Sequence, residues 1–197
     1  TINSQNISCG SFNSWTSLTR QLNLGSSAIT CNFSWNIGNP TNLTINAGTS
    51  FITVNGWFFT GGGFDYHNVA LDPTNDVITV YNSNTFDTLF LAPGAKVRLE
   101  QGTFQLLNDL QATGNCGNMI TLESNSAGNS ATISKSSGTI NVEFLRIKDI
   151  RATPAATFNA INSIDGGNNP GWNFLLSPPG TTWYWIGNSG NWSDPLR

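Results

Sequence analysis

The sequence has few charged residues, one histidine and three cysteines. Charged side chains make up 10% of its 197 residues, against about 25% in an average soluble protein. The eight lysines and arginines are spread along the chain and the net charge is −3. This argues against a nucleic-acid partner, because clustered positive charge supplies most of that affinity. No apolar run approaches the ~18 residues of a membrane-spanning helix, so no transmembrane segment is expected.

Small polar residues are abundant instead. The chain contains 27 Asn, 22 Thr and 20 Ser. Leu, Ile, Val and Phe together number 49, about a quarter of the chain, which is above the ~20% below which disorder is expected. The sequence therefore predicts a folded domain with an apolar core and a largely uncharged polar surface.

Short apolar–polar–apolar triplets recur along the chain at spacings of 19 to 26 residues. Each triplet has the two-residue period of a strand with one buried face. A unit this short cannot bury its own apolar side, whereas stacked units can. The triplets begin at Ile7, Ile29, Ile52, Ile78, Val97, Ile120 and Ile140, with a weaker one at Ile161.

Glycines separate a second set of strand-like segments from several of these triplets. Gly25, Gly48, Gly94 and Gly138 occupy these corners, where a positive φ is needed. The pattern predicts an all-β chain, a right-handed parallel β-helix of seven or eight rungs, with asparagine ladders along its axis. The alternative is an antiparallel β-sandwich. It is disfavoured because Asn55-Gly56 is the only Asn-Gly pair, the pair that two-residue hairpins prefer.

The composition changes near the end of the chain. We expect residues 1–176 to form the repeat module, with Trp172 and Phe174 capping its core. Residues 177–180 read as a Pro/Gly linker and 181–197 as the start of a following module. The chain is therefore interpreted as a segment of a longer protein.

Three carboxylates follow triplets and are candidates for chemistry. Glu100, Glu123 and Glu143 would stack on successive rungs, where oxygen ligands suit Ca²⁺ and paired carboxylates suit hydrolysis or elimination on a polysaccharide. The competing interpretation is an exposed ladder neutralised by Lys96, Arg98 and Arg146. Asp165, in a turn with Gly166 and Asn168, is a further possible Ca²⁺ ligand, although turn chemistry also explains that segment. No other cofactor is expected.

The aromatic and sulfur side chains also follow the repeat. Trp15, Trp35 and Trp57 are spaced by 20 and 22 residues, so they predict either a buried stack, which is favoured, or an exposed strip that binds sugar rings. Cys9 and Cys31 occupy equivalent triplet positions and should touch, as free thiols in preference to a disulfide. Asp65, Tyr66 and His67 look catalytic together, but a solvated loop after three glycines explains them better.

Several segments resemble the repeated modules of very large secreted cell-surface proteins of Bacteroidota-type bacteria, including gliding and adhesion proteins. They are residues 20–31 (RQLNLGSSAITC), 131–140 (ATISKSSGTI), 162–174 (NSIDGGNNPGWNF) and 187–195 (GNSGNWSDP).

The resemblance implies an extracellular, surface-displayed stalk or adhesive module exported by type IX secretion. Its partners would be neighbouring modules of the same chain, surface glycans or the secretion machinery. It implies no catalytic residues. The expected function is structural and adhesive, with a polysaccharide lyase or hydrolase, or a glycan-binding module, as alternatives.

Overall fold

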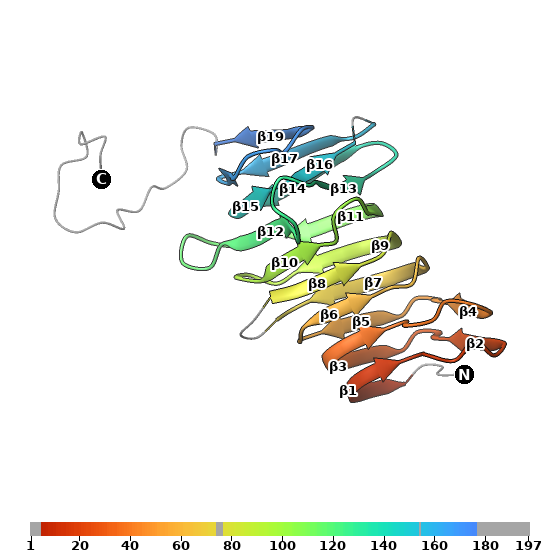
Figure 1. Ribbon diagram of the computed structural model, residues 1–197. Helices are drawn as coiled ribbons and strands as arrows, with labels where there is room; N and C mark the ends of the chain where they lie inside the picture. Colours follow the sequence, from red (N-terminus) through yellow and green to blue (C-terminus); the bar gives the residue numbers. More distant parts are fainter. Residues whose placement is uncertain (1–4, 74–76, 154, 177–197) are drawn as a thin grey trace, which may run out of the picture.

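The protein is an all-β solenoid. The computed structural model describes residues 5–73, 77–153 and 155–176, and every regular element there is a strand. All pairings between the named strands are parallel, and the coils stack into about seven turns of a right-handed parallel β-helix (Figure 1). The predicted fold class is therefore confirmed, and the β-sandwich alternative is wrong.

Three sides make up each coil, and we name them A, B and C in the order in which the chain follows them. Side A contains the first halves of β1 (Asn6–Asn13) and β3 (Ala28–Asn36), then β5 (Phe51–Val54), the second parts of β7 (Asp65–Leu71), β9 (Asn84–Leu91) and β11 (Phe104–Ala112), and finally β14 (Thr139–Glu143), β17 (Thr157–Ile161) and β19 (Trp172–Leu175).

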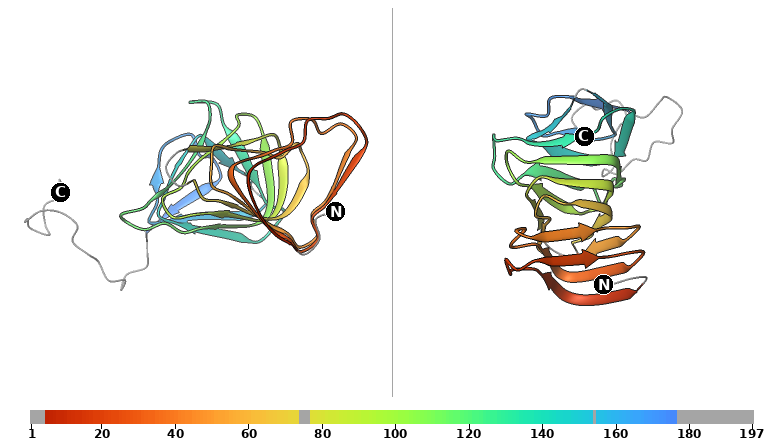
Figure 2. Two further views of the ribbon diagram at one scale, coloured as in Figure 1. Left: turned by 90° about the horizontal axis from the view of Figure 1, so that it is seen from below. Right: turned by 90° about the vertical axis from the view of Figure 1, so that its right-hand side faces the viewer.

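Sides B and C complete the coils. Side B contains the second halves of β1 and β3, then β6 (Phe58–Thr60), β8 (Val77–Tyr81), β10 (Lys96–Leu99), β12 (Ile120–Ser124), β15 (Leu145–Lys148) and β18 (Ile164–Asp165). Side C contains β2 (Arg20–Asn23) and β4 (Leu43–Asn46), then the first parts of β7, β9 and β11, and β13 (Ala131–Ser134) and β16 (Ile150–Ala152). The views of Figure 2 show the coils stacked along one axis.

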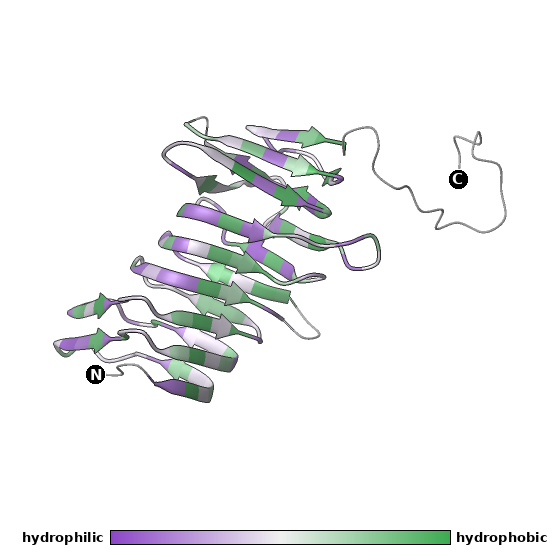
Figure 3. Ribbon diagram, turned by 180° about the vertical axis from the view of Figure 1, so that it is seen from behind, coloured by the Kyte–Doolittle hydropathy of each residue, from purple (hydrophilic) through white to green (hydrophobic). Residues whose placement is uncertain are grey.

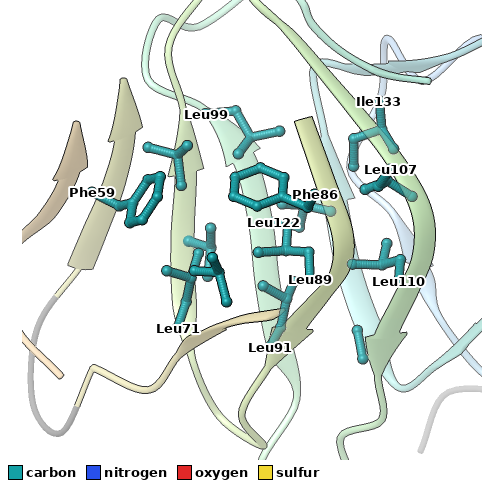
Figure 4. Packing of buried hydrophobic residues seen from close by; sticks show 14 of the residues in the cluster. Phe59, Leu71, Phe86, Leu89, Leu91, Leu99, Leu107, Leu110, Leu122 and Ile133 are labelled. Carbon is teal, nitrogen blue, oxygen red and sulfur yellow. The ribbon is translucent and has the colours of Figure 1, made fainter. Parts of the chain in front are cut away.

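Alternation along the strands fills the interior with apolar side chains. Ile29, Ile52, Val69, Leu89 and Leu110 are register partners along side A, and all are buried. Apolar and polar residues alternate along many strands in Figure 3, and Figure 4 shows the apolar ones meeting inside, with Phe86, Leu99 and Leu122 pointing into the same space. One continuous core therefore joins successive coils, and each coil buries the apolar edge of the next.

The expected single column of triplets is only partly correct. Ile7, Ile29 and Ile52 do pair in register on side A, but the next partner of Ile52 is Val69 rather than Ile78. Ile78 lies on side B and pairs with Val97. The register also places Val97 opposite Leu122, not Ile120. The triplets that begin at Ile78, Val97 and Ile120 therefore belong to a different side of the coil.

The change of side has a local cause. Between Ile29 and Ile52 the coil contains β4, but no strand lies between β6 and β7, where Gly61, Gly62 and Gly63 turn the chain directly. Gly62 and Gly63 have φ of 68° and 82°, which glycine adopts without steric cost. The short coil advances the chain to Val69 after only 17 residues, so the ~22-residue period crosses onto side B.

The predicted glycine corners are confirmed. Gly25, Gly48, Gly94 and Gly138 all have positive φ. Gly48 lies directly against Gly25, whose carbonyl oxygen accepts the Thr49 N–H at 2.7 Å. A Cβ on Gly48 would lie 2.3 Å from that oxygen, so this corner requires glycine for both its conformation and its close stacking.

Asparagine ladders occur as expected. On side A the amide of Asn173 donates to Asn159, and the amide of Asn159 donates to Asn141, at 3.1 and 2.9 Å. Trp172 and Phe174, the expected caps, lie on β19, the last described strand, and Trp172 packs edge-on against Phe158. The linker and following module expected over 177–197 lie outside the described residues.

Candidate functional site

The three glutamates do not form a ladder. Glu123 lies on β12 opposite Arg98 and Lys148, not opposite Glu100, which follows β10. Arg98 Nε donates to Glu123 Oε1 at 2.9 Å. Glu143 lies on β14, on side A. The expected stack is therefore wrong, because the register places a cation next to Glu123 and the third carboxylate lies on another side.

The other two glutamates and Asp165 have hydrogen-bond roles of their own. Glu100 Oε2 accepts the Asn82 N–H at 2.8 Å, and Glu143 Oε1 accepts from the Asn162 amide at 2.9 Å. Asp165 Oδ1 accepts from the Gly167 N–H and the Asn169 amide within its turn. Within residues 5–73, 77–153 and 155–176, no group of three or more His, Cys, Asp and Glu residues is arranged to hold a metal ion. The Ca²⁺ expectation and the lyase alternative thus lose the geometry on which they depended.

Asp149 is a buried carboxylate that the sequence pattern did not single out. It follows β15, has a positive φ of 56° and is 3% exposed. The Asn168 amide donates to it at 2.7 Å and the Gly128 N–H at 3.0 Å. These hydrogen bonds, the one from Asn168 above all, lower the pKa of Asp149 below its usual value. The carboxylate clips the loop after β12 to the turn before β19, which is a structural role.

Of the three repeat tryptophans, Trp35 alone is inside the solenoid. Its ring stacks on Phe12 at 4.2 Å and lies parallel to Phe59 at 6.5 Å. Its indole N–H donates to the Tyr66 hydroxyl at 3.2 Å, and that hydroxyl donates to the Gly61 carbonyl oxygen at 2.8 Å. Burial raises the pKa of Tyr66 above its usual range, so the hydroxyl keeps its proton. Trp35 is therefore a core residue.

Trp57 and Trp15 are on the surface, so the expected common stack is wrong. Trp57 is 55% exposed and stacks at 5.4 Å on Phe33, which is 50% exposed. Trp15 is 64% exposed and lies against Gly38 instead. Sequence analysis missed Phe33, although it precedes Trp57 by 24 residues, close to the repeat. The exposed pair Phe33–Trp57 is the aromatic surface that could contact a ligand.

The predicted cysteine contact is present. Cys9 and Cys31 are register partners, their sulfur atoms lie 3.4 Å apart, and both are free thiols. Burial, together with the contact to Cys9, raises the pKa of Cys31 to about 12. Because the thiolate is the reactive species, this pair is poorly suited to redox chemistry at neutral pH.

His67 is on a strand rather than in a loop. It lies on β7, and its Nε2 is 3.7 Å from a carboxylate oxygen of Asp87 on the next coil. Its neighbour Tyr66 points into the core, so Asp65, Tyr66 and His67 do not face one site. The expectation of a solvated loop was wrong because the glycines form a tight turn.

Comparisons with protein-family models, curated proteins and solved structures found no match to this chain. Over the residues that the structure describes, no helix has the length and apolar character needed to cross a membrane.

Proposed function

We propose that this chain is a structural and adhesive module of a long extracellular surface protein, in which it acts as a stiff stalk or contact segment. The observation that carries the proposal is the continuous stack: buried side chains in register run through successive coils, as Trp35, Phe59, Val80 and Leu99 do on side B. The resemblance to surface-protein modules supports the same role. Neighbouring modules, surface glycans and secretion machinery are its proposed partners.

The mechanical argument follows from the parallel register. Backbone hydrogen bonds between coils point along the solenoid axis, because neighbouring strands are one coil apart. Bending the rod would lengthen these bonds on one side and compress packed side chains on the other. Packed interiors resist such deformation. The module therefore holds a fixed end-to-end length until coils unfold.

Single-molecule force spectroscopy tests this role with the module placed between two folded marker domains. We expect no gradual extension at low force, followed by stepwise lengthening as coils detach. The reference is a Gly/Ser segment of equal residue number, which extends gradually as a flexible chain. A module that extends gradually like that segment would overturn the stalk proposal.

A second candidate function is glycan contact through Phe33 and Trp57. Both rings are about half exposed and stacked, and aromatic faces pack against the apolar faces of sugar rings. On a glycan array, we expect Trp57→Ala to abolish any bound signal, while Trp15→Ala, which removes an exposed tryptophan elsewhere, leaves it unchanged. Equal loss in both variants would contradict a site at this pair.

A further inference from the structure

Side B gathers positive charge that is dispersed in the sequence. Four of the eight lysines and arginines of the chain lie on two strands of this side: Lys96 and Arg98 on β10, and Arg146 and Lys148 on β15. Strand β12 runs between them. Because alternate residues of a strand point the same way, all four side chains face outward while Val97 and Ile147 fill the core.

The register arranges these cations in two rows across the three strands. One row is Lys96, Thr121 and Arg146. The other is Arg98, Glu123 and Lys148, in which Glu123 pairs with Arg98. In each row the two cations are two strand spacings apart, about 10 Å.

The two rows differ in how far their charge is neutralised. Lys96 and Arg146 are exposed, and neither has a hydrogen bond or an ion pair with any described residue. Thr121, between them, contributes a hydroxyl and no charge. Next to the second row the surface is hollowed, over about 220 Å³, between Arg98, Glu123, Asn125, Lys148 and Asp149. The first row therefore offers two free cations beside a polar hollow that contains carboxylates.

We infer that this surface binds an acidic polysaccharide, with Lys96 and Arg146 contacting anionic groups on separate sugars of one chain. Sparse charge on the ligand matches two cations that are well separated on the protein. The hollow beside them suits the rest of a sugar chain, since Glu123 and Asp149 can only accept hydrogen bonds when ionised, and sugar hydroxyls are donors. The site is distinct from Phe33–Trp57 and does not depend on the stalk function.

Other polyanions fit less well. The phosphodiester backbone of DNA has no hydroxyl donors to offer Glu123, and its dense charge is repelled by that carboxylate and by the net charge of −3. Single-stranded nucleic acid is usually bound by aromatic platforms beside the cations, whereas Phe33 and Trp57 lie on β3 and just before β6, several coils away. A protein interface would need an apolar centre, and the residues between the two cationic strands are Thr121 and Glu123.

Binding to immobilised polysaccharides tests the site. The probes are polygalacturonate, which carries carboxylates, dextran sulfate, which carries sulfates, and neutral dextran. We expect low-salt binding to one or both charged polymers and none to dextran. The double variant Lys96→Gln/Arg146→Gln should weaken binding about tenfold, equivalent to about 1.4 kcal/mol. Binding to polygalacturonate alone would identify carboxylate as the recognised group, and binding to dextran sulfate alone would identify sulfate.

A matched control separates the site from net charge. Lys135→Gln/Arg151→Gln removes two positive charges from residues at β13 and β16 on side C, and should leave affinity nearly unchanged. Circular dichroism and thermal unfolding check that both variants fold. The inference would be overturned by no binding to either charged polymer, by equal loss in both double variants, or by a DNA duplex that binds as tightly and responds to the same variant.

Discussion

Sides A and B are built on the same coils but present different surfaces. Among the described strand residues of side A there is no Lys or Arg, and its outer surface carries the ladder of Asn141, Asn159 and Asn173. Side B carries Lys96, Arg98, Arg146 and Lys148. Their interiors are alike, since both present buried apolar residues in register.

The comparison separates stability from recognition. Inward residues are constrained by the coil above and the coil below, so both sides use large apolar side chains there. Outward residues touch only their register neighbours and water. They can therefore differ between sides without changing the fold, which leaves side B available for a charged ligand.

The largest expected effect is on the shared interior. Leu89→Ala on side A and Leu99→Ala on side B should each lower the free energy of unfolding by about 2–5 kcal/mol, because each leaves a cavity in the core. Both leucines are at most 1% exposed. Urea unfolding measures the change. A loss below about 1 kcal/mol on one side only would break the equivalence of the two interiors.

The next effect concerns the corner after β8, where side B ends. Asn84 is 3% exposed, and its amide donates to the carbonyl oxygens of Tyr81 and Asn82 and to Gln105 Oε1. Asn84→Ala leaves these buried acceptors without their donor, for a loss of about 1–3 kcal/mol. The control Asn141→Ala, at the exposed end of the side A ladder, should change stability by less than about 0.5 kcal/mol. Similar urea midpoints for the two variants would contradict this difference.

A pH-dependent effect is expected beside β15. The folded pKa of Asp149 is lowered, so its stabilisation is present above the unfolded value near 4 and is lost as the pH falls through the folded pKa. Asp149→Asn keeps a residue that tolerates positive φ but removes the charge. Thermal unfolding should show wild type more stable at pH ~7, with the difference shrinking below pH ~4. A difference that grows in acid would show that the carboxylate acts in the opposite sense.

The smallest effects are expected on the two outer surfaces. Arg98→Ala removes the ion pair to Glu123 on side B, and Asn159→Ala removes two amide hydrogen bonds on side A. Each should lower stability by less than about 1 kcal/mol. Added salt should reduce the effect of Arg98→Ala only, because salt screens charges. Equal salt dependence in both variants would remove the electrostatic distinction between the sides.

The fold was predictable from local pattern, but the positions of the candidate site residues were not. The triplets and glycine corners indicated stacked coils correctly. Val69-Ala70-Leu71 was missed as a rung because its outward residue, Ala70, is also apolar and hides the alternation. Trp35 and Trp57 follow one sequence period, yet one is inside and the other outside, because two-residue alternation overrides the longer repeat within each coil.

Apolar–polar alternation, with glycine where the chain must turn, is sufficient to predict parallel coils around an apolar core. Side-chain direction alternates in any strand, whichever strand lies beside it. Which strands become neighbours depends on the number of residues that each turn consumes, and the short turn at Gly61–Gly63 changes that number. The opposition of Glu123 to Arg98, and the meeting of four distant cations on side B, therefore follow from the folded register and are not visible in the order of residues.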